Sequence, residues 1–278
     1  MRVFDKNLKE DYPVGGGVLT CMLADNSFDD AESGKNWSRP AVIVVPGGSY
    51  RFVSKREGQP VAECFLAEGF QTFVLTYQTD VDGARYPDQL CQLSCAVDLV
   101  RKRADEFHVQ KDNVFVIGFS AGGHLVANLS NETTLASEVL GVALDCKPTA
   151  VALGYPVVNG HDESFDNLLR GYEGRQADEL RRRLQLDELV SNQTPPTFVW
   201  TTAQDRLVPS QNSLCYALAL ANCGVPYELH VFPFGDHGKS TGGREINGER
   251  DDVSTREQWQ RLATWTSHCA AFFRAFVK

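Results

Sequence analysis

The sequence predicts a doubly wound α/β fold around a mostly parallel sheet, and three observations support this prediction. Several short apolar runs are continuous rather than alternating, which is typical of strands buried on both faces of a sheet. Segments with helical spacing separate these runs, as in folds that alternate strands and helices. The 278 residues, 42% of them hydrophobic, are enough for one large α/β domain, although this length also allows two small ones.

Six apolar runs predict the strands of the sheet. Four of them are rich in β-branched and aromatic residues, and two are weaker but fit the alternation with helices. The four strong runs are residues 41–45, 72–77, 113–119 and 197–203, and the two weaker ones are 150–156 and 227–234.

Five segments with a period near 3.6 residues predict the helices that cover this sheet. Each lies between two predicted strands or follows the last one. They are residues 56–69, 86–108, 121–132, 210–224 and 254–277, and Gly224 is a typical helix stop.

Two polar segments interrupt the alternation. Residues 158–196 are mostly helix-forming and lie between two predicted strands, and residues 238–254 form a glycine-rich loop. Both follow the ends of strands, where open α/β sheets bind their ligands. We therefore expect a single domain over residues 1–278, with a small helical cap insert at 158–196. The glycine run at 13–17 predicts a hairpin turn.

Composition and charge argue against several classes of protein. The formal net charge is −9 and the few basic runs lie in mixed-charge helices, so we expect no nucleic-acid partner. No apolar run approaches the roughly 18 residues that span a bilayer, and the first residues lack a secretory pattern. Eight scattered cysteines without a CxxC pair favour reduced thiols over disulfides. These features predict a cytoplasmic protein without a membrane partner, for which a homo-oligomer is possible.

One short motif carries the main chemical signal. Gly118-Phe119-Ser120-Ala121-Gly122 is a G-x-S-x-G with a buried strand before it and a helix after it. Such a sharp turn brings backbone against backbone, so that glycines flank a serine whose hydroxyl is exposed at a helix N-terminus. This context predicts that Ser120 is a nucleophile. The alternative is that Ser120 only caps the helix.

A serine hydroxyl needs a base, and the base needs a carboxylate to orient it. Asp205 and His237 each follow a later predicted strand, in the chain order serine, acid, histidine that this kind of site uses. Asp236 cannot easily reach back to its own neighbour His237. The other histidines are weaker candidates for the base, although one of them, in the insert, could line the pocket. They are His108, His124, His161, His230 and His268.

The turn after the first strong strand predicts an oxyanion hole. Pro46-Gly47-Gly48-Ser49 can direct the backbone N–H groups of Gly48 and Ser49 at a developing negative charge, and the N–H of Ala121 completes the set. The alternative is a plain strand-end turn. We find no HExxH, no Cys/His pair and no carboxylate cluster, so we expect no metal. The absence of a GxGxxG after a strand predicts no dinucleotide cofactor, and this chemistry requires no other cofactor.

These residues and their neighbours resemble a known family. The stretches VVPGGSYRFVSKREGQPVA, VIGFSAGGHLVA, LGYPVV and DRLVPSQNSLCYALALANCGVPYELHVFPFGDHG are similar to α/β-hydrolase esterases related to acetyl xylan and feruloyl esterases, from residue 40 to the end. The resemblance implies the same nucleophile, acid, base and oxyanion contacts. Many relatives carry a third glycine where this chain has Ser49, and often a histidine where it has Pro46. Ser49 keeps its N–H, but its side chain can narrow the pocket.

We therefore expect a serine carboxylesterase that hydrolyses short-chain acyl esters through an acyl-enzyme. Acetyl groups on sugars or xylo-oligosaccharides are one substrate class. A serine amidase or peptidase of the same fold is the first alternative, and a non-catalytic ligand-binding protein of this fold is the second. In the insert, Phe165, Leu168, Leu169 and Tyr172 could form an apolar wall of the site or could simply pack the insert onto the body.

Overall fold

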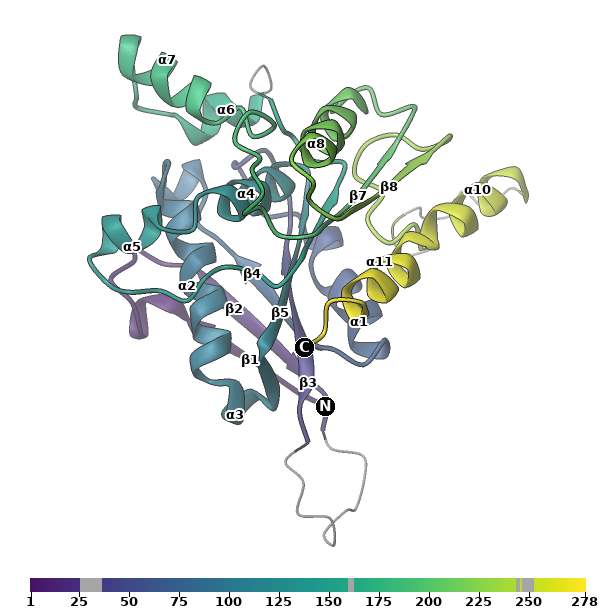
Figure 1. Cartoon of the computed structure of the whole chain (residues 1–278), viewed down its shortest axis with the longest axis horizontal. Helices are drawn as coiled ribbons and strands as arrows, with labels where there is room; N and C mark the ends of the chain where they lie inside the picture. The colour runs from purple at the N-terminus through teal and green to yellow at the C-terminus, as the bar shows by residue number, and fades with distance from the viewer. Residues whose placement is uncertain (26–36, 160–162, 244–245, 247–252) are drawn as a thin grey trace, which may run out of the picture.

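A mixed eight-stranded sheet forms the centre of the protein, and helices cover both of its faces (Figure 1). The computed structural model describes residues 1–25, 37–159, 163–243, 246 and 253–278. The strands lie in the order β1-β2-β4-β3-β5-β6-β7-β8. In this order each neighbouring pair from β4 to β8 is parallel, whereas β2 pairs antiparallel with both β1 and β4. The strands are Arg2–Asn7, Val18–Leu23, Arg39–Val45, Gln71–Thr76, Val109–Phe119, Val151–Gly154, Thr197–Thr202 and Tyr227–Phe232.

All six predicted strands are present, and the doubly wound, mostly parallel sheet is confirmed. Neither β1 nor β2 is predicted by an apolar run. The missed pair forms a hairpin, with Arg2 opposite Leu23 and Asn7 opposite Val18, and the glycine run at 13–17 lies in its connection as predicted. The β1 strand is mostly exposed and carries charged residues, so it lacks the apolar run by which the buried strands were found.

The helices follow the prediction with two breaks. The segment predicted at 86–108 divides at Arg103, whose side chain bonds Glu106 and Asp11. The segment predicted at 254–277 divides at Thr264, whose hydroxyl donates to the Arg261 carbonyl and so competes with the helical pattern. The sequence analysis did not predict α5. The helices are α1 Gln59–Ala67, α2 Asp88–Lys102, α3 Ala104–Phe107, α4 Ala121–Asn131, α5 Leu135–Leu140, α6 Glu163–Leu168, α7 Gly174–Arg183, α8 Gln211–Asn222, α10 Val253–Ala263 and α11 Trp265–Arg274.

The two faces of the sheet bury different side chains. Along β3, Ile43 joins a largely aliphatic core beneath α2, α4 and α8, while its neighbour Val44 joins an aromatic core beneath α1 and α11. Figure 1 shows α2 and α4 on one side of the sheet and α1 and α11 on the other. In the aromatic core Trp200 stacks on Trp265 with ring centroids 5.0 Å apart. Strands buried on both faces in this way explain the continuous apolar runs in the sequence.

The polar segment between β6 and β7 folds as α6 and α7 and lies beyond the carboxyl ends of the strands (Figure 1). Phe165, Leu168 and Leu169 are buried in the aliphatic core, which fixes α6 to the body of the protein. Within the described residues no helix is both long and apolar enough to cross a membrane.

Candidate active site

Ser120 lies in a strained turn between β5 and α4. Its backbone has φ 52° and ψ −122°, a conformation that non-glycine residues rarely adopt. A Cβ atom on Gly118 would lie 2.3 Å from the Gly122 carbonyl oxygen, and a Cβ on Gly122 would lie 2.3 Å from the Val45 carbonyl oxygen. Because these contacts leave no room for side chains, the turn requires glycine on both sides of Ser120.

The structure brings together the three residues predicted as nucleophile, base and acid. The Nε2 atom of His237 lies 2.9 Å from the Ser120 hydroxyl, and its Nδ1 lies 2.6 Å from Asp205 Oδ2. Since a carboxylate only accepts hydrogen bonds, Nδ1–H donates to Asp205 and Nε2 is left to accept the serine proton. The other oxygen of Asp205 accepts from the N–H groups of Leu207 and Val208, which fixes the carboxylate in place.

The predicted oxyanion turn has an unusual backbone. Gly48, Ser49 and Tyr50 have φ values of 125°, 52° and 58°, so three successive residues are left-handed. In the described part of the chain, nothing accepts a hydrogen bond from the N–H of Gly48, Ser49 or Ala121. Ser49 and Ser120 line the same cavity. Backbone N–H groups that face a cavity beside a nucleophile can stabilise an oxyanion.

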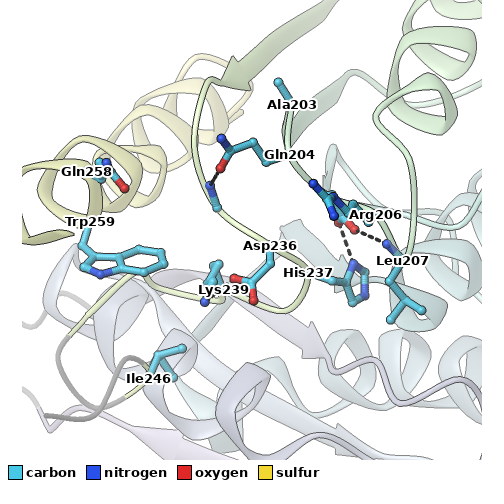
Figure 2. A pocket seen from close by; sticks show the side chains of 12 residues that line it. Ala203, Gln204, Arg206, Leu207, Asp236, His237, Lys239, Ile246, Gln258 and Trp259 are labelled. Atoms are coloured by element: carbon cyan, nitrogen blue, oxygen red, sulfur yellow. Dashed lines mark hydrogen bonds and ion pairs between the residues drawn. The ribbon is translucent and has the colours of Figure 1, made fainter. Parts of the chain in front are cut away.

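Two cavities meet near these residues. One, of about 640 Å³, is lined by Ser49 and Ser120 together with polar side chains that include Asn159 and Glu163. The other, of about 1030 Å³, reaches His237 but not Ser120. Figure 2 shows this larger cavity, with His237 and Trp259 on opposite sides of it. Of these two cavities, the smaller one is lined by both Ser120 and Ser49, the predicted nucleophile and a predicted oxyanion donor.

His124 and Asp236, the weaker candidates for base and acid, make other contacts. His124 is buried, with Nδ1 2.8 Å from the Tyr50 hydroxyl and Nε2 3.3 Å from the Leu184 carbonyl oxygen, so it joins the oxyanion turn to the insert. Asp236 points away from the ring of His237 and pairs with Lys239 (Figure 2). Burial opposes ionisation of Asp236, but the Lys239 ammonium outweighs it and holds the pKa of this carboxyl below its ordinary value.

Three of the remaining histidines, His230, His268 and His108, lie on β8, on α11 and at the end of α3. His230 and His268 stack on one another with centroids 5.0 Å apart, and His108 ends α3. His161 lies outside the described residues.

The apolar residues of the insert do not line the cavity that contains Ser120. Phe165, Leu168 and Leu169 are buried, and the Tyr172 hydroxyl donates to the Tyr86 carbonyl. Of the two roles considered for them, packing the insert onto the body is therefore the one that the structure shows. The insert contributes polar groups to the cavity instead, through Asn159 and Glu163.

Three residues near the site, Asn167, Glu57 and Tyr155, were not predicted from the sequence. Asn167 of α6 donates to the Ser49 carbonyl at 2.9 Å. Glu57 accepts from the Gly47 N–H at 2.9 Å and from the Tyr155 hydroxyl at 2.8 Å. Glu57 lies only ten positions after Gly47, but its second partner is 98 residues away along the chain, and no local pattern indicates that contact.

The chain matches a known protein family and is similar to curated proteins. A family model described as BD-FAE matches residues 30–220. Endo-1,4-beta-xylanase B of Butyrivibrio fibrisolvens is 30% identical over 246 residues, which are 85% of this chain and 37% of that protein. Acetylxylan esterase of Xylanibacter ruminicola is 29% identical over 247 residues, which are 86% of this chain and 46% of that protein. The chain thus spans less than half the length of these two relatives.

Solved structures match over nearly the whole chain. The carboxylesterase Cest-2923 from Lactobacillus plantarum superposes with a TM-score of 0.82 at 27% identity, covering 100% of this chain and 99% of that one. An acetyl ester-xyloside bifunctional hydrolase from Caldicellulosiruptor lactoaceticus superposes with a TM-score of 0.78 at 29% identity, covering 100% and 98%.

Proposed function

This chain belongs to the BD-FAE family and has the α/β-hydrolase fold, and from that premise we propose that it is a serine carboxylesterase acting on short-chain acyl esters. One observation carries the proposal. The hydrogen-bonded series Ser120–His237–Asp205 opens on a cavity that Ser49 also lines.

In the proposed mechanism, Ser120 Oγ attacks the ester carbonyl carbon while its proton passes to His237 Nε2. Asp205 stabilises the imidazolium, and the N–H groups of Gly48, Ser49 and Ala121 stabilise the oxyanion. When the tetrahedral intermediate collapses, the ester C–O bond breaks and the alcohol leaves with the proton from His237. Water then attacks the acyl-enzyme with His237 again as base, and releases the carboxylic acid and the free serine.

We further propose that the alcohol part of the substrate is a sugar and that the acyl group is short. The cavity at Ser120 is lined by the polar side chains of Asn159, Glu163, Gln211 and Asn212, which suit hydroxyl groups, beside the apolar Leu207, Val208 and Pro209. Two of the similar proteins are named as an acetylxylan esterase and an acetyl ester-xyloside hydrolase. In this proposal residues 158–196 act as a small cap within one domain, and the mechanism uses no cofactor.

The test is hydrolysis of p-nitrophenyl acetate, butyrate and octanoate by the wild type and by Ser120→Ala. We expect acetate to be turned over fastest and Ser120→Ala to lose on the order of 10⁶-fold in kcat. Ser130→Ala is the matched control, because Ser130 lies on α4 and its hydroxyl bonds only the Val126 carbonyl among the described residues. Equal rates for wild type and Ser120→Ala on every ester would refute the proposal. Faster cleavage of the matching anilide would indicate an amidase instead.

A further inference from the structure

Glu57 is a buried acidic residue beside the nucleophile that the proposed mechanism does not use. Its side chain belongs to a residue only 3% exposed, in a short 3₁₀ turn that precedes α1. Among the described residues no lysine, arginine or histidine forms an ion pair with it. Burying a carboxylate without a cation is costly unless its oxygens accept hydrogen bonds. The partners that compensate Glu57 therefore indicate what it is for.

One oxygen of Glu57 holds the start of the oxyanion turn. Oε2 accepts from the Gly47 N–H at 2.9 Å, immediately before the two predicted oxyanion donors. Gly47 also lies against the nucleophile, because a Cβ on Gly47 would be 2.8 Å from Ser120 Cβ and 3.0 Å from Glu57 Oε2. A shift of this carboxylate would therefore move the oxyanion turn relative to Ser120.

The other oxygen of Glu57 leads to the loop that carries His237. Oε1 accepts from the Tyr155 hydroxyl at 2.8 Å, and the Tyr155 oxygen accepts from the Ser240 N–H at 3.0 Å. Burial, and then the nearby carboxylate, raise the pKa of Tyr155 well above its ordinary value, so the phenol keeps the proton that it donates. The Tyr155 ring also packs edge-on against the imidazole of His237, with centroids 4.9 Å apart.

A second contact joins the same two segments. The Ser240 hydroxyl donates to the Arg56 carbonyl at 2.5 Å, next to Glu57 in the chain. The 3₁₀ turn at Lys55–Glu57 is thus bonded to the oxyanion turn on one side and to the His237 loop on the other.

We propose that Glu57, acting through Tyr155, is a positioning residue that fixes the oxyanion turn relative to the loop of His237. The inference rests on the proposed esterase function. Glu57 does not touch substrate; it sets the distance between the donors that stabilise the oxyanion and the base that takes the serine proton.

The chemistry of the two partners makes a carboxylate necessary. Gly47 N–H and Tyr155 O–H both donate, and a carboxylate can accept at both of its oxygens. Glu57→Gln keeps the shape but offers one acceptor oxygen, and its NH₂ group must then face a donor. Tyr155→Phe removes the bridge to Ser240 while leaving the aromatic ring in place.

The experiment compares Glu57→Gln, Tyr155→Phe, their double variant and the control Glu63→Gln in hydrolysis of p-nitrophenyl acetate. Glu63 is exposed on α1, and in the part of the chain that the structure describes it bonds only Gln59. We expect Glu57→Gln to lower kcat on the order of 10²-fold, as misplacement of catalytic groups does, with little change in KM. Tyr155→Phe should lower kcat in the same way, and the double variant should lose less than the product of the two. Glu63→Gln should behave as wild type.

Several outcomes would overturn the inference: a folded Glu57→Gln variant with wild-type kcat, a rise in KM alone, or losses that multiply in the double variant. If Glu57→Gln does not fold, Tyr155→Phe against wild type decides by the same criteria. If the wild type hydrolyses no ester, the esterase proposal fails separately. The positioning role of Glu57 is then tested by the rate at which a fluorophosphonate labels Ser120. Glu57→Gln should slow this labelling, and Glu63→Gln should not.

Discussion

The turn that carries Ser120 and the loop that carries His237 are held in different ways. Around Ser120 the backbone itself is packed so closely that Gly118 and Gly122 have no space for a Cβ atom. The loop of His237 is held by side chains instead: Thr202 donates to the Gly235 carbonyl at 2.7 Å, and Trp265 donates to the Ser240 carbonyl at 2.8 Å. Ser120 is therefore fixed by steric exclusion and His237 by hydrogen bonds.

This difference has a practical meaning for substitutions. A steric constraint tolerates no added atom, whereas each hydrogen bond contributes a modest and separate amount. Side-chain atoms added at Gly118 or Gly122 should thus abolish the folded site. Loss of single hydrogen bonds around His237 should lower the esterase activity in steps.

The largest effect is expected for Gly122→Ala. The new Cβ would lie 2.3 Å from the Val45 carbonyl oxygen and 2.4 Å from that of Pro46, so the strand or the helix must move. We expect a loss of more than about 4 kcal/mol in the free energy of unfolding, measured by denaturant melts, together with loss of esterase activity.

Gly141→Ala is the control for this prediction. Gly141 has φ 66°, and apart from its own chain neighbours no atom of the described residues lies within 4 Å of the place that an added Cβ would occupy. Alanine there adds backbone strain of about 1–2 kcal/mol and no clash. If the two variants lose equal stability, steric exclusion does not explain the Ser120 turn.

Asp205→Asn should come next. The N–H groups of Leu207 and Val208 donate to Oδ1, so the amide would keep its oxygen there and direct its NH₂ at His237. The ring must then carry its proton on Nε2, where it cannot accept from Ser120. We expect kcat to fall about 10⁴-fold with little change in melting temperature, and a variant that retains high activity would contradict this hydrogen-bond assignment.

Thr202→Val should have the smallest effect of the three. It removes the hydroxyl that holds Gly235 with little change of shape, so we expect about 1 kcal/mol lower stability and a mild decrease in kcat. Thr201→Val is the matched control, because the buried Thr201 hydroxyl has no hydrogen-bond partner among the described residues, and its loss should be neutral or stabilising. If Thr201→Val loses more stability than Thr202→Val, hydrogen bonds are not what holds the His237 loop.

The same contrast explains how far sequence could predict the molecule. The motif of the Ser120 turn was recognisable because its five residues are consecutive in the sequence, even though Gly122 packs against Val45 in a distant strand. Asp205 and His237 were found because each follows a predicted strand, β7 for Asp205 and β8 for His237, and the parallel sheet brings such strand ends to one edge. The order of Ser120, Asp205 and His237 along the chain then matched the order serine, acid, histidine of this kind of site.

What sequence did not predict depends on contacts between distant segments. The strand β2 becomes a strand by pairing with β4, for example Val18 with Thr76, and its own residues carry only a weak pattern. Glu57 lies in a segment that looks like the polar start of a helix. Its hydrogen bond to Tyr155, 98 residues further along the chain, forms only when the folded sheet brings the two segments together.

The position of Trp265 has a consequence for synthesis of the protein. This side chain supplies the hydrogen bond that anchors Ser240, and α11 also stacks Phe273 on Phe115 beneath β5. A ribosome makes α11 after Ser120, Asp205 and His237. A nascent chain that has already exposed Ser120, Asp205 and His237 therefore still lacks the support beneath the His237 loop, and we expect it to stay inert until α11 has left the exit tunnel.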